Sequence, residues 1–325
     1  MTVPINEAPM SKVSVDESTV VLGIETSCDE TAVAVVMGGT DVLSSVVASQ
    51  LAEHARFGGV VPEIASRAHL EALPHVTAQA MQQANIDLSR VDAVAATVGP
   101  GLIGALLVGV SAAKATALAL DVPFIGVNHL EAHLYAALLD EPNAEFPMLF
   151  GLVSGGHTLF VEMLDYDSYR VIGQTIDDAA GEAFDKVARF LGLSYPGGPA
   201  IDAAATRGND KAINFPRAIL NDGLDVSFSG LKTSVINHVR ANPSVSTDDV
   251  AASFQRAVVD VLVHKARRAA RQINARTIAL GGGVAATVVA LAHRAGLHLL
   301  EPEQGVGQRR LASTGTAHQH DALPF

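Results

Sequence analysis

Residues 20–37, VVLGIETSCDETAVAVVM, hold two apolar runs of strand-forming residues on either side of a short polar turn. The pattern predicts two neighbouring strands, and the Gly38-Gly39 turn leads into a third apolar run. Helix and strand patterns then alternate up to residue 127. The predicted elements are strands at 20–25, 31–37 and 41–48, a helix over 62–83, a strand at 91–97, a Gly/Ala-rich helix over 101–120 and a strand at 122–127.

The same order begins again at residues 148–164, MLFGLVSGGHTLFVEML. Three strands are predicted at 148–153, 158–164 and 169–175, followed by helices, a strand at 276–280, a further helix and a strand at 297–300. Two meanders that each lead into helix–strand alternation favour an α/β fold with two lobes facing one another across a central cleft. The predicted domains are a disordered lead-in at 1–18, a first lobe at 19–127, a second lobe at 128–300 and an atypical tail at 301–325.

The composition is that of a globular protein with an acidic balance. Hydrophobic residues make up 49% and charged residues 17% of the 325, and 22 Lys and Arg against 34 Asp and Glu give a net charge of −12. This balance argues against broad, unaided binding to nucleic acid, so a nucleic-acid site must be local or assisted by a partner. One local basic run could contact phosphates or form a solvated helix face; it comprises Lys265, Arg267, Arg268, Arg271 and Arg276.

Several features predict a protein of the cytoplasm. Cys28 is the only cysteine, which excludes an internal disulfide and favours a reducing compartment. The first residues lack the basic start and apolar core of a signal peptide. The most apolar stretch, GLIGALLVGVSAAKATALAL at 101–120, is interrupted by Lys114 and predicts a buried helix packed on the sheet, with a membrane span as the alternative.

In open α/β sheets, ligands bind beyond the carboxyl ends of the strands, so the turns at those ends are candidate sites. Four such turns are small or glycine-rich: ETSCDET (25–31), VGPGLIG (98–104), VSGGHT (153–158) and LGGGVAA (280–286). Glycine lets backbone N–H groups approach a phosphate or an acyl oxygen closely, although it also simply permits tight turns. Asp29 and Glu30 in the first turn could act as helix caps or as general bases.

Residues 127–140, VNHLEAHLYAALLD, place His129 and His133 four residues apart in a predicted helix. Both imidazoles would share one helix face, whereas Glu131 would point elsewhere and does not reproduce the H-E-x-x-H pattern of metallopeptidases. Two imidazoles alone do not hold a metal, so a solvated or hydrogen-bonded pair is the alternative.

Carboxylates occur further along in GEAFDKVARFLGLSYPGGPAID at 181–202. Asp185 and Asp202 of this stretch could hold ribose hydroxyls or cap helices. The stretch FSGLKT at 228–233 predicts a helix capped by its Ser or Gly, with Lys232 facing the cleft.

Taken in order, these motifs resemble the universal tRNA threonylcarbamoyladenosine transferase family, in particular its bacterial members. The motifs that carry the resemblance lie between residues 20 and 286: VLGIETSCDETAVAVV, NHLEAHLYAALL, LVSGGHT, GEAFDKVARFLGLSYPGGPAID, FSGLKT, SFQ and LGGGVAA. The resemblance implies an actin-like two-lobed fold of the sugar-kinase and Hsp70 type. It also implies transfer of a threonylcarbamoyl group from threonylcarbamoyl-adenylate to the N6 amine of the adenosine next to the anticodon, in tRNAs that read codons starting with A.

The resemblance also implies roles for particular residues. His129 and His133 become ligands of one divalent metal ion, iron in most of the family, with zinc as the alternative. The implied substrate-binding residues are Leu152, Val153, Ser154, Gly155, Gly156, Asp185, Gly198 and Asp202. A metal ion fits the chemistry, because a mixed anhydride needs polarised oxygens while an amine attacks. The implied partners are tRNA, a paralogous actin-like subunit and a small ATPase subunit, with no membrane.

The end of the chain departs from the family pattern. Thr287 stands where the family has an Asn, and the ending at 301–325 lacks the Thr-Asp-Asn segment whose Asp is the third metal ligand. It also lacks the apolar helix that closes the family's first lobe. A genuine divergence and a change of reading frame are both open. His318, His320 and Asp321 are candidates for replacement ligands, although a short polar tail is expected to be disordered.

Other functions compete with the transferase. A catalytically defective paralogue or frameshifted copy would act at most as a binding scaffold, and low metal content would distinguish it from an active enzyme. A metallopeptidase is disfavoured because no Glu is placed beside the histidine pair as general base. An ATPase follows from analogy of fold alone.

Overall fold

The computed structural model describes residues 15–140, 144–283 and 310–313. The predicted strand at 297–300, most of the predicted lead-in and the candidate ligands of the tail lie outside the described residues. The chain divides into two compact units. The division falls between Leu139 and Asp140, whereas the sequence places it after residue 127, so the helix that carries the histidine pair belongs to the first unit.

The first unit is built on a five-stranded sheet with the order β3-β2-β1-β4-β5. Its strands are β1 (Val20–Glu25), β2 (Glu30–Met37), β3 (Asp41–Ser49), β4 (Ala93–Gly99) and β5 (Phe124–Asn128). The first three form the predicted antiparallel meander, and β4 and β5 extend the sheet in parallel. All six residues of β1 are buried, because this apolar strand lies in the middle of the sheet.

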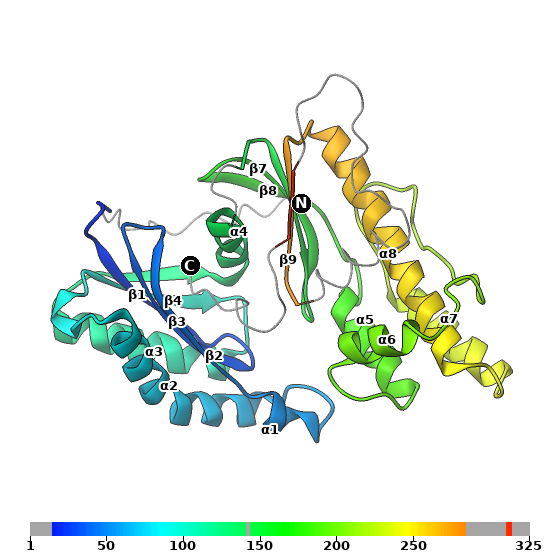
Figure 1. Ribbon diagram of the computed structural model, residues 1–325, viewed down its shortest axis with the longest axis horizontal. Helices are drawn as coiled ribbons and strands as arrows, with labels where there is room; N and C mark the ends of the chain where they lie inside the picture. Colours follow the sequence, from blue (N-terminus) through cyan, green and yellow to red (C-terminus); the bar gives the residue numbers. More distant parts are fainter. Residues whose placement is uncertain (1–14, 141–143, 284–309, 314–325) are drawn as a thin grey trace. The chain divides into compact units, whose positions relative to one another are not determined.

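Helices α2 (Pro62–Ala84) and α3 (Ile103–Leu120) cover one face of this sheet (Figure 1). Pro62 opens α2 at a position where its missing N–H breaks no helical hydrogen bond, and Asn85 ends the helix in the left-handed region with a φ of 53°. The other helices of the unit are α1 (Leu51–Ala55), the 3₁₀ turn η1 (Leu88–Arg90) and α4 (His129–Asp140).

The sheet-facing side of α3 is made of small residues. Ala105, Gly109, Ala113 and Ala117 are buried, and a Cβ on Gly109 would lie 2.4 Å from Thr26 Oγ1. Small side chains therefore let the helix approach the end of β1 closely. By length and composition α3 is also a candidate membrane span, but core helices of other proteins pass the same test.

The opposite side of α3 is apolar and exposed. Ile103, Leu107 and Leu118 are 78%, 59% and 84% exposed. The prediction of a buried helix is therefore correct for the Ala/Gly face and wrong for this face.

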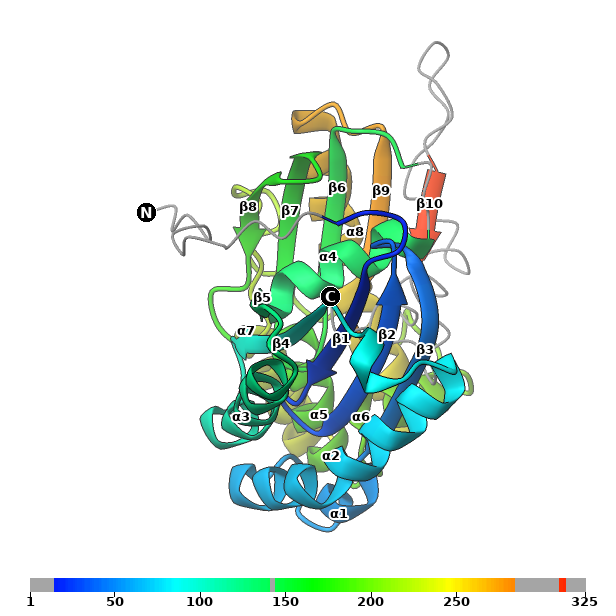
Figure 2. The same cartoon turned by 90° about the vertical axis from the view of Figure 1, so that its left-hand side faces the viewer.

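The second unit is built on a five-stranded sheet with the order β10-β9-β6-β7-β8, which Figure 2 shows side by side. Its strands are β6 (Met148–Val153), β7 (Thr158–Asp165), β8 (Ser168–Gln174), β9 (Thr277–Gly281) and β10 (Arg310–Ser313). The strands β6, β7 and β8 form the second predicted meander, and β9 pairs with β6 in parallel. β10 pairs with β9 in parallel, so part of the tail that is expected to be disordered forms a strand.

Four helices of the second unit form a layer beside this sheet (Figure 1). They are α5 (Ala180–Phe190), α6 (Gly197–Ala205), α7 (Ser229–Ala241) and α8 (Thr247–Gln272). The long helix α8 starts at Ser246, whose side chain accepts a hydrogen bond from the N–H of Asp249, and it is buried along most of its length. Phe184 and Phe254 join α5 to α8 edge to face, with 5.1 Å between ring centroids.

Candidate functional site

Five of the predicted substrate-binding residues lie at the end of β6 and in the turn that follows it: Leu152, Val153, Ser154, Gly155 and Gly156. Leu152 and Val153 are buried, whereas the two glycines are exposed. The N–H of Ser154 donates to the carbonyl of His157 over 2.8 Å and closes the turn. The turn therefore presents the backbone of two glycines at the carboxyl end of β6.

The start of α5 packs directly on this turn. The N–H of Gly181 donates to Ser154 O over 3.2 Å. A Cβ on Gly181 would lie 2.6 Å from that oxygen and 2.7 Å from Gly155 Cα. Only glycine allows this approach, which fixes the amino end of α5 against the turn.

Asp185 connects α5 to α6. Its Oδ1 accepts a hydrogen bond of 2.7 Å from the N–H of Gly197, at the first position of α6. Asp185 thus acts as a cap, one of the two roles that the sequence leaves open. Gly198 follows; it is buried, yet outside its chain neighbours and the adjoining backbone of α6 no described heavy atom lies within 4 Å of where its Cβ would be.

Asp202 lies on α6 and is bound from α8. Its Oδ1 accepts a hydrogen bond of 2.8 Å from Gln255 Nε2. Gln255 is the last residue of the SFQ motif, to which the residue pattern alone gives no role. In the structure Gln255 orients the carboxylate of Asp202, a predicted substrate-binding residue.

The turn after β9 completes the cluster. A Cβ on Gly282 would lie 2.7 Å from Val153 O, so this turn runs beside the end of β6. Among the described residues other than each glycine's chain neighbours, no heavy atom lies within 4 Å of a Cβ built on Gly155, Gly156 or Gly283. The predicted residues of the second unit therefore gather around open backbone and two oriented carboxylates, an arrangement suited to a nucleoside or a phosphate.

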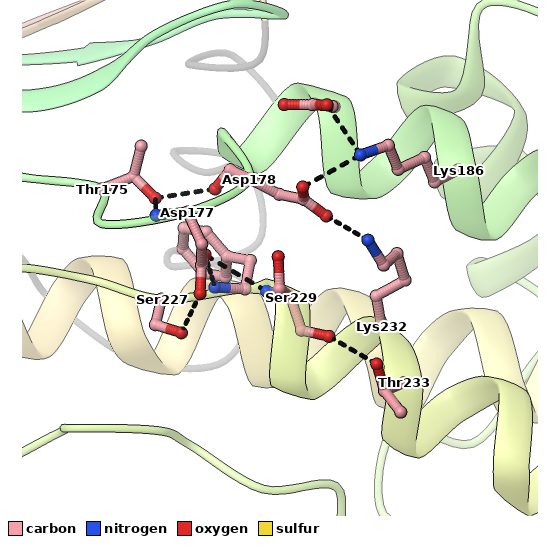
Figure 3. Close-up of polar contacts among 10 residues, drawn as sticks. Thr175, Asp177, Asp178, Lys186, Ser227, Ser229, Lys232 and Thr233 are labelled. Carbon is pink, nitrogen blue, oxygen red and sulfur yellow. Dashed lines mark hydrogen bonds and ion pairs between the residues drawn. The ribbon is translucent and has the colours of Figure 1, made fainter.

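A second carboxylate pair stands beside this cluster, between β8 and α5 (Figure 3). Asp178 Oδ1 accepts from Lys186 Nζ at 2.9 Å and Oδ2 accepts from Lys232 Nζ at 2.5 Å. Burial opposes ionisation of Asp178, but the hydrogen bonds and charges of the two lysines outweigh it and lower the pKa of this carboxyl. Lys232, which the sequence predicts to face the cleft, binds Asp178 through its ammonium group.

Asp177 caps α7 from outside the helix. Its carboxylate accepts hydrogen bonds from the N–H groups of Phe228 and Ser229 at 2.8 and 3.2 Å, and from the hydroxyl of Ser227 (Figure 3). The predicted start of a helix in FSGLKT is confirmed, but its cap is not the Ser or Gly of the motif. Two adjacent Asp residues before α5 are the only signal that the sequence offers for this network.

In the first unit, α4 brings His129 and His133 together. Their ring centroids are 4.8 Å apart and the rings meet edge to face, as two residues one turn apart on a helix face should. The Nδ1 of His129 lies 3.4 Å from Glu25 Oε2 and 3.3 Å from Ser27 Oγ.

Glu25 is the buried carboxylate at the end of β1. Burial alone would raise its pKa, but the hydrogen bond and charge of His129, with hydrogen bonds from Ser27 N–H and Thr97 Oγ1, bring the pKa down to about 2. A carboxylate at Nδ1 orients an imidazole and favours hydrogen on that nitrogen, which directs Nε2 to a ligand. The sequence pattern singles out Asp29 and Glu30 of the same turn and misses Glu25.

The two imidazoles fit part of a coordination shell for a divalent transition metal. They are nitrogen donors on adjacent helical turns, and a carboxylate stands behind one of them, as in many metal sites. No group of three or more His, Cys, Asp or Glu that could hold a metal ion occurs in the part of the chain that the structure describes. A full shell therefore needs donors beyond the described residues.

Comparison with known proteins gives the family. The family model described as tRNA N6-adenosine threonylcarbamoyltransferase matches residues 41–305. The chain belongs to this family. The tRNA N6-adenosine threonylcarbamoyltransferase of Caldicellulosiruptor saccharolyticus is 53% identical over 270 residues, 82% of this chain and 80% of the relative. That of Bacillus cereus is 54% identical over 282 residues, 85% of this chain and 82% of the relative.

Membership of the transferase family agrees with the resemblance seen in the sequence motifs. The family match runs to residue 305, beyond residue 286 where the motifs end.

Two solved structures share the fold at low sequence identity. Full-length HypF superposes with a TM-score of 0.58 at 13% identity, covering 94% of this chain and 53% of HypF. Component A of (R)-2-hydroxyglutaryl-CoA dehydratase from Acidaminococcus fermentans superposes with a TM-score of 0.55 at 14% identity, covering 92% and 93% of the two chains. These likenesses confirm the predicted actin-like fold and carry no functional argument.

Proposed function

We propose that this member of the transferase family transfers the threonylcarbamoyl group from threonylcarbamoyl-adenylate to the N6 amine of the adenosine next to the anticodon, in tRNAs reading codons that start with A. The observation that carries the proposal is identity of 53% and 54% to transferases of this name over more than four fifths of the chain. The chain is accordingly an acyltransferase that modifies tRNA.

The second unit is proposed to hold the nucleotide end of the adenylate. Gly155 and Gly156 expose their backbone at the end of β6, Gly198 borders open space, and Asp185 and Asp202 are carboxylates already oriented by neighbours. Backbone amides at strand ends and helix starts suit a phosphate, and carboxylates suit ribose hydroxyls.

The reaction joins an amine to an activated acyl carbon. The N6 nitrogen attacks the carbamoyl carbon, the new N–C bond forms, and the C–O bond to the phosphate breaks so that AMP leaves; a base must accept the proton of the amine. His129 and His133 are proposed to hold one divalent ion, iron by family resemblance with zinc as the alternative. When bound, such an ion polarises the oxygens of the anhydride. Glu25 would keep His129 oriented for this role.

The proposed partners are tRNA, a paralogous actin-like subunit and a small ATPase subunit, in the cytoplasm and without a membrane. The exposed apolar side of α3 supports a protein partner, because three large apolar side chains stand exposed there: Ile103, Leu107 and Leu118. The acidic net charge of −12 also fits a protein that needs help to present tRNA.

The alternatives have less support. No observation on the described residues favours a defective scaffold, and the relatives at 53% and 54% identity carry the name of the transferase. A metallopeptidase would need a general base beside the histidine pair, and the Glu of α4 is not at the H-E-x-x-H position.

The test is mass spectrometry of tRNA from cells whose only copy of this transferase is the present chain. We expect threonylcarbamoyladenosine in tRNAs that read codons starting with A. Asp202→Asn and His133→Ala should each lower it strongly, whereas Asp167→Asn, in the exposed turn between β7 and β8, should not. Absence of the modified base from cells in which the parent chain is present and folded would contradict the proposal.

A further inference from the structure

A buried polar relay crosses the core of the first unit, between β2, α1 and α2. Its members, Thr31, Gln50, His54 and His69, are at most 4% exposed. Buried polar side chains are kept in a fold when each finds a partner, and two buried imidazoles in one relay are unusual enough to ask what they hold. The proposed function gives none of the four a role.

The contacts of His69 fix its protonation state. Its Nε2 lies 3.1 Å from Cys28 O, which can only accept, so Nε2 carries the hydrogen. Its Nδ1 lies 3.1 Å from Gln50 Nε2, which can only donate, and 2.7 Å from Thr31 Oγ1. Nδ1 must therefore accept, and His69 is neutral. Burial agrees with this, because it lowers the pKa of His69.

The other contacts of Gln50 fix the orientation of its amide. Nε2 also reaches Ala65 O at 3.4 Å, an acceptor, and Oε1 lies 3.1 Å from His54 Nε2, which therefore donates. His54 Nδ1 in turn accepts from the N–H of Val61 at 3.3 Å. All donors point the same way, and the relay runs in the order Val61, His54, Gln50, His69, Cys28.

The relay ends on a loop that is held at three consecutive carbonyls. Ser27 O accepts from Leu102 N–H at 2.8 Å, and Asp29 O accepts from Gln50 N–H at 2.9 Å. The imidazole of His69 binds the carbonyl between them. Each carbonyl is held from a different part of the unit, so the path of the loop is set by all three contacts.

This loop also borders the histidine pair. Ser27 Oγ lies 3.3 Å from His129 Nδ1, and the N–H of Ser27 donates to Glu25. A shift at Cys28 would therefore move Ser27 and Glu25 relative to the imidazole that they orient.

We propose that His69, in its neutral form with hydrogen on Nε2, is a positioning residue: it holds the carbonyl of Cys28 and so sets loop 26–30 beside His129 for the transfer reaction. The proposal rests on the proposed function for its effect on turnover.

Protonation of His69 would work against the relay. The carboxylates of Glu25 and Asp29 and the imidazole of His54 are the titratable groups that act on it. A hydrogen on Nδ1 would face the amide hydrogens of Gln50, so the amide would have to turn, and it would then no longer accept from His54. The hydrogen bonds of the relay would then either all reverse their direction or be lost.

The first test is the pH profile of Gln50→Glu. A carboxylate at this position would accept from both imidazoles and so raise the pKa of His69. We expect the acid limb of the kcat profile to move to higher pH by about one unit or more, with KM for threonylcarbamoyl-adenylate unchanged. If His69 served folding alone, Gln50→Glu would shift neither limb of the kcat profile.

Substitutions of His69 itself give the second test. His69→Gln keeps a neutral donor toward Cys28 O and should retain turnover while losing the acid limb. His69→Leu keeps the volume but not the hydrogen bond and should lower kcat about tenfold to a hundredfold. His75→Gln, on the exposed side of the same helix, is the matched control and should behave as the parent. Circular dichroism confirms that each variant is folded.

Nitrogen NMR of the histidines separates the possible failures. The parent should show His69 as the neutral form with hydrogen on Nε2, and His69→Leu, unlike His69→Gln, should shift the His129 resonances. If the parent makes no threonylcarbamoyladenosine, the proposed function fails, and unshifted His129 resonances would then overturn the relay as well. If the parent is active and His69→Leu is folded with normal kcat, the relay proposal alone is wrong.

Discussion

Gly197 and Gly198 are neighbours in the first turn of α6 with opposite surroundings. A Cβ on Gly197 would lie 2.5 Å from Asp185 Cα, whereas a Cβ on Gly198 would meet no described heavy atom within 4 Å outside its chain neighbours and the adjoining backbone of α6. The first glycine serves the packing of α6 on α5. The second leaves room beside a buried backbone, where we place the nucleoside.

The two glycines should therefore respond differently to alanine. Gly197→Ala should lower the free energy of unfolding by about 1–3 kcal/mol, because backbone atoms must shift. Gly198→Ala should leave it unchanged or raise it by up to about 1 kcal/mol, since alanine favours a helix. It should, however, abolish the thermal protection that an adenylate analogue gives the parent, which equals RT ln(1 + [L]/Kd). Thermal unfolding with and without the analogue measures both, and full protection of Gly198→Ala would contradict the pocket.

Single residues also show where sequence reasoning stops. Spacing along one helix suffices to pair His129 with His133, and the structure places them in ring contact. Spacing along one element does not reveal Glu25, because its partner His129 is 104 residues away in the chain. The sequence around Glu25 is that of an ordinary strand end. Local sequence patterns reveal pairs of residues on one element, whereas contacts between residues that are distant in the chain are recognised only from the structure.

At the scale of elements, Asp178 ties α5 to α7. One oxygen binds Lys186 on α5 and the other binds Lys232 on α7, while the neighbouring Asp177 caps α7 (Figure 3). Asp178 is 13% exposed in its side chain, so its two ion pairs are partly shielded from water. This loop therefore holds the amino ends of two helices in one arrangement.

Stability should depend on this carboxylate at low pH. The folded pKa of Asp178 lies below the ordinary 3.8, so below that pH the unfolded chain binds the proton first and stability falls as the pH drops through the folded pKa. Asp178→Asn should remove this part of the acid sensitivity and lower the free energy of unfolding at pH 7 by about 1–3 kcal/mol.

Urea unfolding from pH 2.5 to 7 measures the acid sensitivity of the parent and of Asp178→Asn. The matched control is Asp167→Asn in an exposed turn, which should change neither quantity by more than about 0.5 kcal/mol. If the acid profile of Asp178→Asn matched that of the parent, the ion pairs of Asp178 with the two lysines would make no contribution to the acid sensitivity of stability.

The sequence predicts helices and strands correctly where their apolar runs are long. The strands of both meanders are confirmed to within one residue at each end. The strand predicted at 91–97, which follows the first meander, is found two residues further along, at Ala93–Gly99. The five-residue helix α1 is too short to show a helical period. β10 lies in a polar tail and is recognisable only through its pairing with β9, which no local pattern encodes.

At the scale of the whole molecule, charge is the dominant feature for a protein that must meet tRNA. The net charge is −12, and the basic run on α8 and just after it, residues 265–276, is partly used within the fold. Lys265 is fully buried, and its Nζ donates to three backbone carbonyls. Arg268 donates to Asn221 O, and Arg276 pairs with Glu145. Lys265 is therefore excluded as a phosphate contact, contrary to one reading of the sequence, and the remaining basic patch is small.

The isolated chain should consequently bind tRNA weakly. We expect a dissociation constant of about 10⁻⁴–10⁻⁶ M at physiological salt, the range of non-specific binding, because few cations are available to displace counterions. Adding the proposed paralogous and ATPase subunits should tighten tRNA binding. Fluorescence anisotropy with labelled tRNA over a salt series measures affinity and slope together, and Arg271→Ala, which removes an exposed cation from α8, should reduce the slope by about one at most. Nanomolar binding by the chain alone would mean that it holds a basic tRNA surface of its own, and the need for partners would have to be explained by the chemistry instead.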